Sequence, residues 1–199
     1  MSQPISRDEA WTLLAEWVSS ASLRRHCQCV EAAMRAYADR FGEDPELWGV
    51  AGLLHDADYE RHPDMDADDG HPRTIIAELE RRDADPRIVR TILVHAPFMG
   101  VPAETPMEKS ILAVDELCGF LVACAAVRPD GIVGLTPKSV KKKLKQTSFA
   151  AAVSREDVHG GAEELGVDFD EHVTFVIAAL EARADELELR GSPAASTAQ

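Results

Sequence analysis

The sequence lacks any apolar run long enough to cross a membrane. Its longest nearly apolar run, residues 117–127, falls far short of the ~20 residues that span a bilayer. Residues 1–4 have neither the basic nor the apolar region of a secretory signal peptide. From these two absences we expect a soluble, cytoplasmic protein with no membrane partner.

Cysteine is scarce, which argues against a secreted scaffold held together by disulfides. The cysteines are Cys27, Cys29, Cys118 and Cys124. They are too few and too clustered for such a framework. Cys27 and Cys29 stand one residue apart inside a helical pattern, which is not the spacing of a paired-knuckle zinc site. We therefore expect reduced thiols that pack between helices.

Positive charge is also in short supply. The chain has 21 Lys and Arg residues against 35 Asp and Glu residues, so its formal net charge is −14. Nucleic acids and anionic membranes repel such a protein at long range. We therefore expect no general nucleic-acid binding, although a local basic patch can still hold a small anion.

No internal repeat and no shift in composition divides the chain. Its 199 residues, 45% of them hydrophobic, suit one ordinary globular domain. We expect this domain to span residues 1–191, with a core over residues 23–126 and C-terminal helices over residues 137–190. Residues 192–199 are expected to form a disordered tail.

The strict alternation of polar and apolar residues that marks strands is missing. Apolar residues recur instead at three- and four-residue spacing behind helix-start signals, which predicts an all-α, compact helical fold. The segment 111–127 is hydrophobic on nearly every side and is expected to be the central buried helix. The other expected helices cover residues 7–19, 23–42, 45–54, 72–82, 86–96 and 168–189, with short ones after Thr136 and Ser154.

The acidic segment 58–70 resembles a calcium loop but fails the test for one. If Asp64 takes the first position of an EF-hand, Asp69 stands where glycine is needed and Ile75 where a bidentate glutamate is needed. We interpret the segment as a solvated loop beside the site.

Two histidines interrupt otherwise apolar helix faces. His26 shares a face with Val30, and His95 shares one with Ile88 and Ile92, so both imidazoles are expected to point toward the core. A single inward histidine is more often a hydrogen-bonded core residue than a metal ligand. Taken alone, neither histidine therefore indicates a metal site.

Asp115 interrupts the most apolar helix of the chain. Burying an ionised carboxylate without a partner costs roughly several kcal/mol, so buried acids are usually paired or bound to metal. A pairing with Arg24, Arg25 or Arg35 would also satisfy it. One divalent cation shared with the inward imidazoles is the simpler account.

The order His26, adjacent His55 and Asp56, then Asp115 resembles the H…HD…D signature of the HD-domain superfamily of metal-dependent phosphohydrolases. The resemblance covers residues 23–126, and more loosely residues 127–129 and 139–143, and these stretches are similar to bacterial predicted HD hydrolases of similar length. It implies that these four residues ligate a metal. The chain has Ala57 and Asp58 where the common version has Ile-Gly, which argues against the signalling phosphodiesterase branch.

In family members with two metals, histidines between the His-Asp pair and the last aspartate bind the second ion. His71 and His95 occupy those places, and Asp56 would bridge the two ions. The resemblance therefore implies one or two divalent ions, which could be Mn, Fe, Zn, Mg or Ni, because the ligand types do not choose among these metals.

The resemblance implies a hydrolase of phosphoric esters that acts on a small phosphorylated metabolite or nucleotide, with His55 and Asp56 at its catalytic centre. Lysines at helical spacing offer a phosphate contact, although such stripes are commonly only solvated faces. The candidate substrate-binding residues are Lys141, Lys142, Lys145 and Arg128.

Two other functions stay open. The six residues His26, His55, Asp56, His71, His95 and Asp115 also follow the ligand order of a diiron HD-type oxygenase resembling myo-inositol oxygenase. A non-catalytic metal-binding regulatory module would use the same ligands for stability alone. The sequence does not indicate an oligomeric state.

Overall fold

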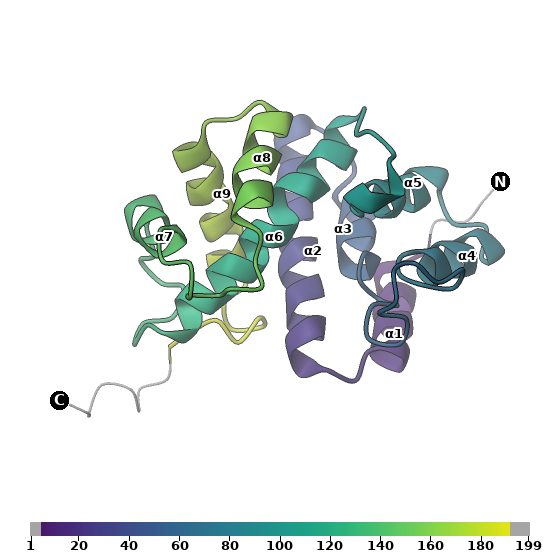
Figure 1. The fold of residues 1–199 in the computed structure, drawn as a ribbon, viewed down its shortest axis with the longest axis horizontal. Helices are drawn as coiled ribbons and strands as arrows, with labels where there is room; N and C mark the ends of the chain where they lie inside the picture. The colour runs from purple at the N-terminus through teal and green to yellow at the C-terminus, as the bar shows by residue number, and fades with distance from the viewer. Residues whose placement is uncertain (1–4, 192–199) are drawn as a thin grey trace. The chain divides into compact units, whose positions relative to one another are not determined.

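The computed structural model describes residues 5–191, and all the regular structure within that range is helical (Figure 1). The all-α prediction is therefore confirmed. None of the described helices is both long and apolar enough to cross a bilayer. The helices are α1 (Arg7–Trp17), α2 (Ala21–Phe41), α3 (Pro45–Leu54), α4 (Arg73–Arg81), α5 (Pro86–Val94), the 3-10 helix η1 (Pro97–Met99), α6 (Pro106–Ala126), α7 (Pro137–Leu144), α8 (Arg155–Leu165) and α9 (Phe169–Ala182).

The chain separates into two compact units, residues 1–112 and residues 113–199, and the boundary falls inside α6. The single domain over residues 1–191, with its core over residues 23–126, stays a prediction. The expected tail at residues 192–199 and the N-terminal residues 1–4 lie outside the described residues.

The helix boundaries follow the capping signals in the sequence. Ser6 and Glu9 form a capping box at the start of α1, in which the Glu9 carboxylate accepts from the Ser6 backbone N–H at 2.9 Å. Gly42 ends α2 in the left-handed conformation, with φ of 72°. Asp44 caps α3, and its side chain accepts from the Glu46 backbone N–H.

Two expected boundaries are wrong. Pro72 is the residue before α4 rather than part of its first turn. The last helix ends at Ala182 instead of near residue 189, because the chain turns there and buries Leu187 and Leu189. The backbone carbonyl of Leu189 accepts from the N–H of Ile132 at 2.9 Å, a pairing between distant segments that helix periodicity does not reveal.

Helix α3 is the centre of the first unit. It contacts α1, α2 and α5, and all residues from Leu47 to Leu54 are buried. A helix buried on every side is fixed by packing rather than by its own propensity. The end of α3, where His55 and Asp56 follow, is therefore held in place by three neighbouring helices.

In the second unit, the later part of α6 is buried as expected, with Leu117, Phe120 and Leu121 inaccessible to solvent. Val127, which the sequence placed at the end of this buried helix, is instead 57% exposed. His172 is also buried, and its Nε2 lies 3.0 Å from the carbonyl oxygen of Ala113. It is therefore a hydrogen-bonded core histidine.

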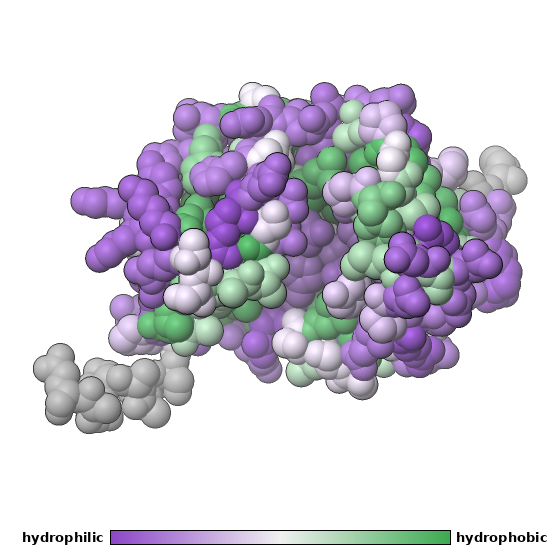
Figure 2. Space-filling view, viewed as in Figure 1, coloured by the Kyte–Doolittle hydropathy of each residue, from purple (hydrophilic) through white to green (hydrophobic). Residues whose placement is uncertain are grey.

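The four cysteines are buried thiols, as expected from their positions on helix faces. Burial raises the pKa of the Cys124 thiol to about 11, which keeps it protonated at neutral pH. On the outside, Figure 2 shows hydrophilic residues over most of the face that it draws, with hydrophobic residues gathered in smaller patches.

Gly52 lets α3 approach α2 closely. A Cβ atom at this position would lie 3.0 Å from the backbone carbonyl oxygen of Val30 and from the backbone N of Glu31. His26 lies one turn before Val30 on α2, and His55 lies one turn after Gly52. This close contact therefore determines the separation of the two histidines.

We predict that Gly52→Ala lowers the free energy of unfolding by about 1–3 kcal/mol, because the neighbouring backbone cannot move away from the added methyl group. Denaturant unfolding measures the effect. The matched control is Gly160→Ala on α8, where an added Cβ meets nothing within 4 Å and stability is expected to stay equal or rise by up to about 1 kcal/mol. Equal stability of both variants would contradict the close contact.

Candidate metal centre

His55 and Asp56 directly follow α3. His55 is the C-cap residue of this helix and is fully buried, while the Asp56 side chain is 19% exposed. The imidazole of His55 is oriented locally, since its Nδ1 lies 2.8 Å from the carbonyl oxygen of Gly52. The side chain thus points its Nε2 away from its own helix.

The Asp56 carboxylate lies among four imidazoles, two on each oxygen. Its Oδ2 is 3.4 Å from Nε2 of His55 and 3.7 Å from Nε2 of His26. Its Oδ1 is 3.5 Å from Nε2 of His71 and 3.6 Å from Nε2 of His95. All five residues belong to the first unit, so the structure brings together five of the six residues that the sequence singled out.

Hydrogen bonds on Nδ1 assign the protons of three of these four imidazoles. In both His55 and His95, Nδ1 lies against the backbone carbonyl oxygen three residues earlier. In His71, Nδ1 lies 2.7 Å from Oδ1 of Asp58. Because a carbonyl or carboxylate oxygen only accepts, Nδ1 carries the proton, and a neutral ring presents a lone pair on Nε2.

The Nε2 lone pairs of His55, His71 and His95 then face carboxylate oxygens, and acceptors that face acceptors repel each other without a cation. Nitrogen and oxygen ligands about 2.1 Å from one ion lie roughly 3 to 4 Å from each other, as these atoms do. Three candidate ligand atoms, one each from Asp56, His71 and His95, all lie within 4.8 Å of one another. The residues present therefore fit a divalent metal.

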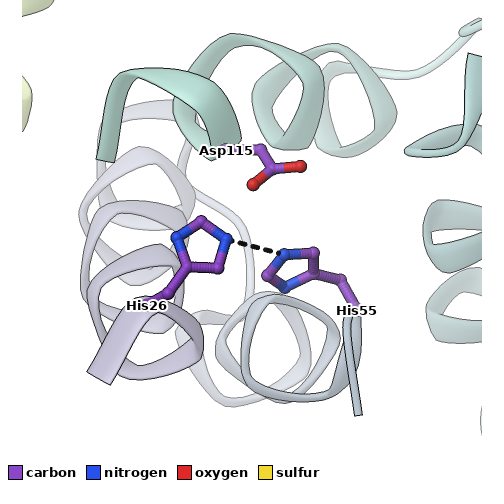
Figure 3. Close-up of side chains that lie close together, drawn as sticks. All are labelled: His26, His55 and Asp115. Carbon is purple, nitrogen blue, oxygen red and sulfur yellow. Dashed lines mark hydrogen bonds between the residues drawn. The ribbon is translucent and has the colours of Figure 1, made fainter. Parts of the chain in front are cut away.

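The candidate ligands that the resemblance assigns to the first ion lie on the other side of Asp56. Nε2 of His26 lies 3.2 Å from Nε2 of His55, and Figure 3 draws this contact as a dashed line. Figure 3 also labels Asp115, which α6 carries three residues beyond Leu112. Because Asp115 belongs to the second unit, its place in the ligand set stays a prediction.

The electrostatics favour an ionised Asp56. Burial raises the pKa of this carboxyl group, but the positive charge and the donated hydrogen bond of a protonated His55, followed by those of His95 and His26, lower it further. A divalent cation that replaces these protons between the rings and the carboxylate lowers the pKa in the same direction. The resulting pKa lies well below the ordinary value for aspartate. Asp56 is therefore a negative charge at neutral pH, available to a cation on either of its oxygens.

Sequence reasoning missed Asp58. We assigned it to a solvated acidic loop, but it is fully buried, and its carboxylate accepts from His71 Nδ1 and from the backbone N–H of Ile75 at 2.9 Å. The acidic residues after it, from Glu60 to Asp69, are exposed as expected. Only its position two residues after Asp56 distinguishes it from them, and composition gives no such signal.

The candidate substrate-binding residues lie in the second unit and stay a prediction. Lys141 forms an ion pair with Asp170 at 2.7 Å. The guanidinium of Arg128 donates to the carbonyl oxygens of Gly131 and Val133, which gives it a structural role in that turn.

A cavity of about 460 Å³ occupies another part of the first unit. The first turns of α3, α5 and α6 line it, and Trp48, Thr91 and Met107 are among its residues. His55 and His95 stand at the opposite ends of α3 and α5, which at ten and nine residues are roughly 14–15 Å long. None of the residues around this cavity is a candidate metal ligand.

The HD-domain family model matches residues 23–115. This part of the chain is an HD domain. The match begins three residues before His26 and ends at Asp115, so it includes all the candidate ligands and confirms the resemblance seen in the sequence. No curated protein and no solved structure matches the chain. HD domains bind divalent metals and are generally metal-dependent hydrolases.

We predict that Asp56→Ala abolishes metal binding by the HD domain, because both groups of imidazoles lose the carboxylate that they share. Elemental analysis of the protein after metal loading and desalting gives the metal-to-chain ratio. His62→Ala is the control, since His62 pairs with Asp69 away from the centre and is expected to leave the ratio unchanged. Retention of all bound metal by Asp56→Ala would contradict the shared-carboxylate site.

Proposed function

We propose that this HD domain is a metal-dependent phosphohydrolase that acts on a small phosphorylated metabolite or nucleotide. The observation that carries the proposal is the Asp56 carboxylate, which presents one oxygen to His26 and His55 and the other to His71 and His95. Such a carboxylate suits two cations that share it. Paired cations about 3.5–4 Å apart are common in enzymes that cleave phosphate esters.

Each residue has a definite part in this proposal. His26 and His55 would hold one cation and His71 and His95 the other, while Asp56 would offset part of their positive charge. When bound, such ions polarise a phosphoryl oxygen and lower the pKa of a water molecule to about 7. The hydrogen bonds on the Nδ1 atoms of His55 and His95 keep their Nε2 atoms directed at the centre before substrate arrives.

A diiron oxygenase is the second candidate. The position of His71 and His95 beside Oδ1 of Asp56 supports it. Together with His26 and His55, these histidines and Asp56 make up five of the six ligands that the diiron oxygenases use. The two functions share their ligands and differ in metal and reaction. A regulatory module without catalysis has no observation of its own in its favour.

We predict that the metal-loaded protein releases phosphate from at least one member of a panel of nucleotides, sugar phosphates and cyclic dinucleotides. Asp56→Ala is expected to lower kcat/KM by more than about 100-fold, beyond the 10–100-fold typical of losing an outer partner of a metal ligand. A colorimetric phosphate assay measures both, with His62→Ala as the control. Absence of hydrolysis across the panel would refute the proposed activity.

The requirement for molecular oxygen distinguishes the phosphohydrolase from the oxygenase. Hydrolysis of a phosphate ester consumes no oxygen, so a phosphohydrolase works equally well in anaerobic buffer. Iron in the protein as isolated, together with oxygen consumption on addition of substrate, would instead support the oxygenase. An oxygen electrode and elemental analysis of the same preparation make this measurement.

A further inference from the structure

The histidines on Asp56 differ in what holds them. His55 and His95 each direct Nδ1 at a neutral backbone carbonyl oxygen. His71 instead directs Nδ1 at a carboxylate, that of Asp58, at 2.7 Å, and Asp58 is fully inaccessible to solvent. The Oδ1 side of Asp56 therefore has a buried carboxylate behind one of its imidazoles.

We propose that Asp58 is a positioning residue that strengthens metal binding on the His71 and His95 side of Asp56. The inference rests on the proposed metal centre. A carboxylate that accepts from one ring nitrogen fixes the tautomer and makes the other nitrogen a stronger ligand. It also adds a negative charge near the cation, in a buried region where solvent screens it little.

The orientation of Asp58 is itself fixed by the start of α4. Pro72, the residue before α4, provides no side-chain cap for the helix. Oδ2 of Asp58 takes that place by accepting from the Ile75 backbone N–H at 2.9 Å, while Oδ1 accepts from His71. Both carboxylate oxygens are therefore committed, and the Asp58 side chain joins the helix start to the metal ligand.

The substitution Asp58→Asn changes the charge and the hydrogen bonds at this position but keeps the shape of the side chain. Its amide has nearly the volume of the carboxylate but offers one accepting oxygen and one donating NH₂ group. If the oxygen stays on Ile75, the NH₂ group faces Nδ1 of His71 and forces the ring proton onto Nε2, which then cannot bind metal. If the oxygen stays on His71, the negative charge is lost and the Ile75 N–H meets a donor. Both outcomes weaken the same cation position.

The first experiment is calorimetric titration of the metal-free full-length protein with Zn²⁺ alone. The wild type is expected to bind two ions, and Asp58→Asn is expected to weaken one of them by about 10–100-fold and leave the other unchanged. Asp66→Asn is the matched control, because Asp66 is an exposed carboxylate of the same loop and its loss removes the same charge. Unchanged affinities in Asp58→Asn, or equal weakening of both ions, would overturn the proposal.

The second experiment needs no variant and detects the tautomer itself. Two-bond ¹H–¹⁵N spectra of the metal-free wild type at pH 8 are expected to show His71 protonated on Nδ1, and protonation on Nε2 would overturn the proposal.

Two bound ions without phosphate release would refute the proposed hydrolase and leave this inference standing. A wild type that binds no ion would refute the metal centre and, with it, the role of Asp58.

Discussion

The interaction on which this HD domain depends is the meeting of four imidazoles at one aspartate. A buried carboxylate beside neutral histidines whose lone pairs point at it is unfavourable by itself, since acceptors face acceptors. In the proposed site, a cation on each oxygen would turn the same arrangement into a favourable one.

The helices around the centre hold these side chains in place. Helix α3 is buried on all sides and ends where His55 and Asp56 begin, so the two residues have little freedom to move apart. Gly52 sets the approach of α2, and Asp58 ties the loop after Asp56 to the start of α4. The ligands therefore come from a helix interior, two helix ends and one loop that a buried carboxylate fixes at its base.

The negative charge of the chain has a second consequence near this centre. A formal net charge of −14 disfavours polyanions, yet it also lowers the energy of divalent cations near the protein. A phosphorylated substrate would approach an acidic surface but bind to a centre on which the cations have reversed the local sign. Selectivity for small anions over nucleic acids is consistent with that combination.

The sequence by itself determined the helical class, most helix boundaries and the order of the ligands. Capping residues such as Ser6 and Asp44 act over three or four positions, so they can be read along the chain. Only the tertiary structure decided that His71 and His95 share one oxygen of Asp56 and that Asp58 lies behind His71. Periodicity gives the face of a helix on which a residue lies, but the distance between faces on different helices depends on packing. For the same reason the burial of Asp58 could not be predicted, because its partners are an imidazole and a helix N-terminus that the chain reaches only after a solvated loop.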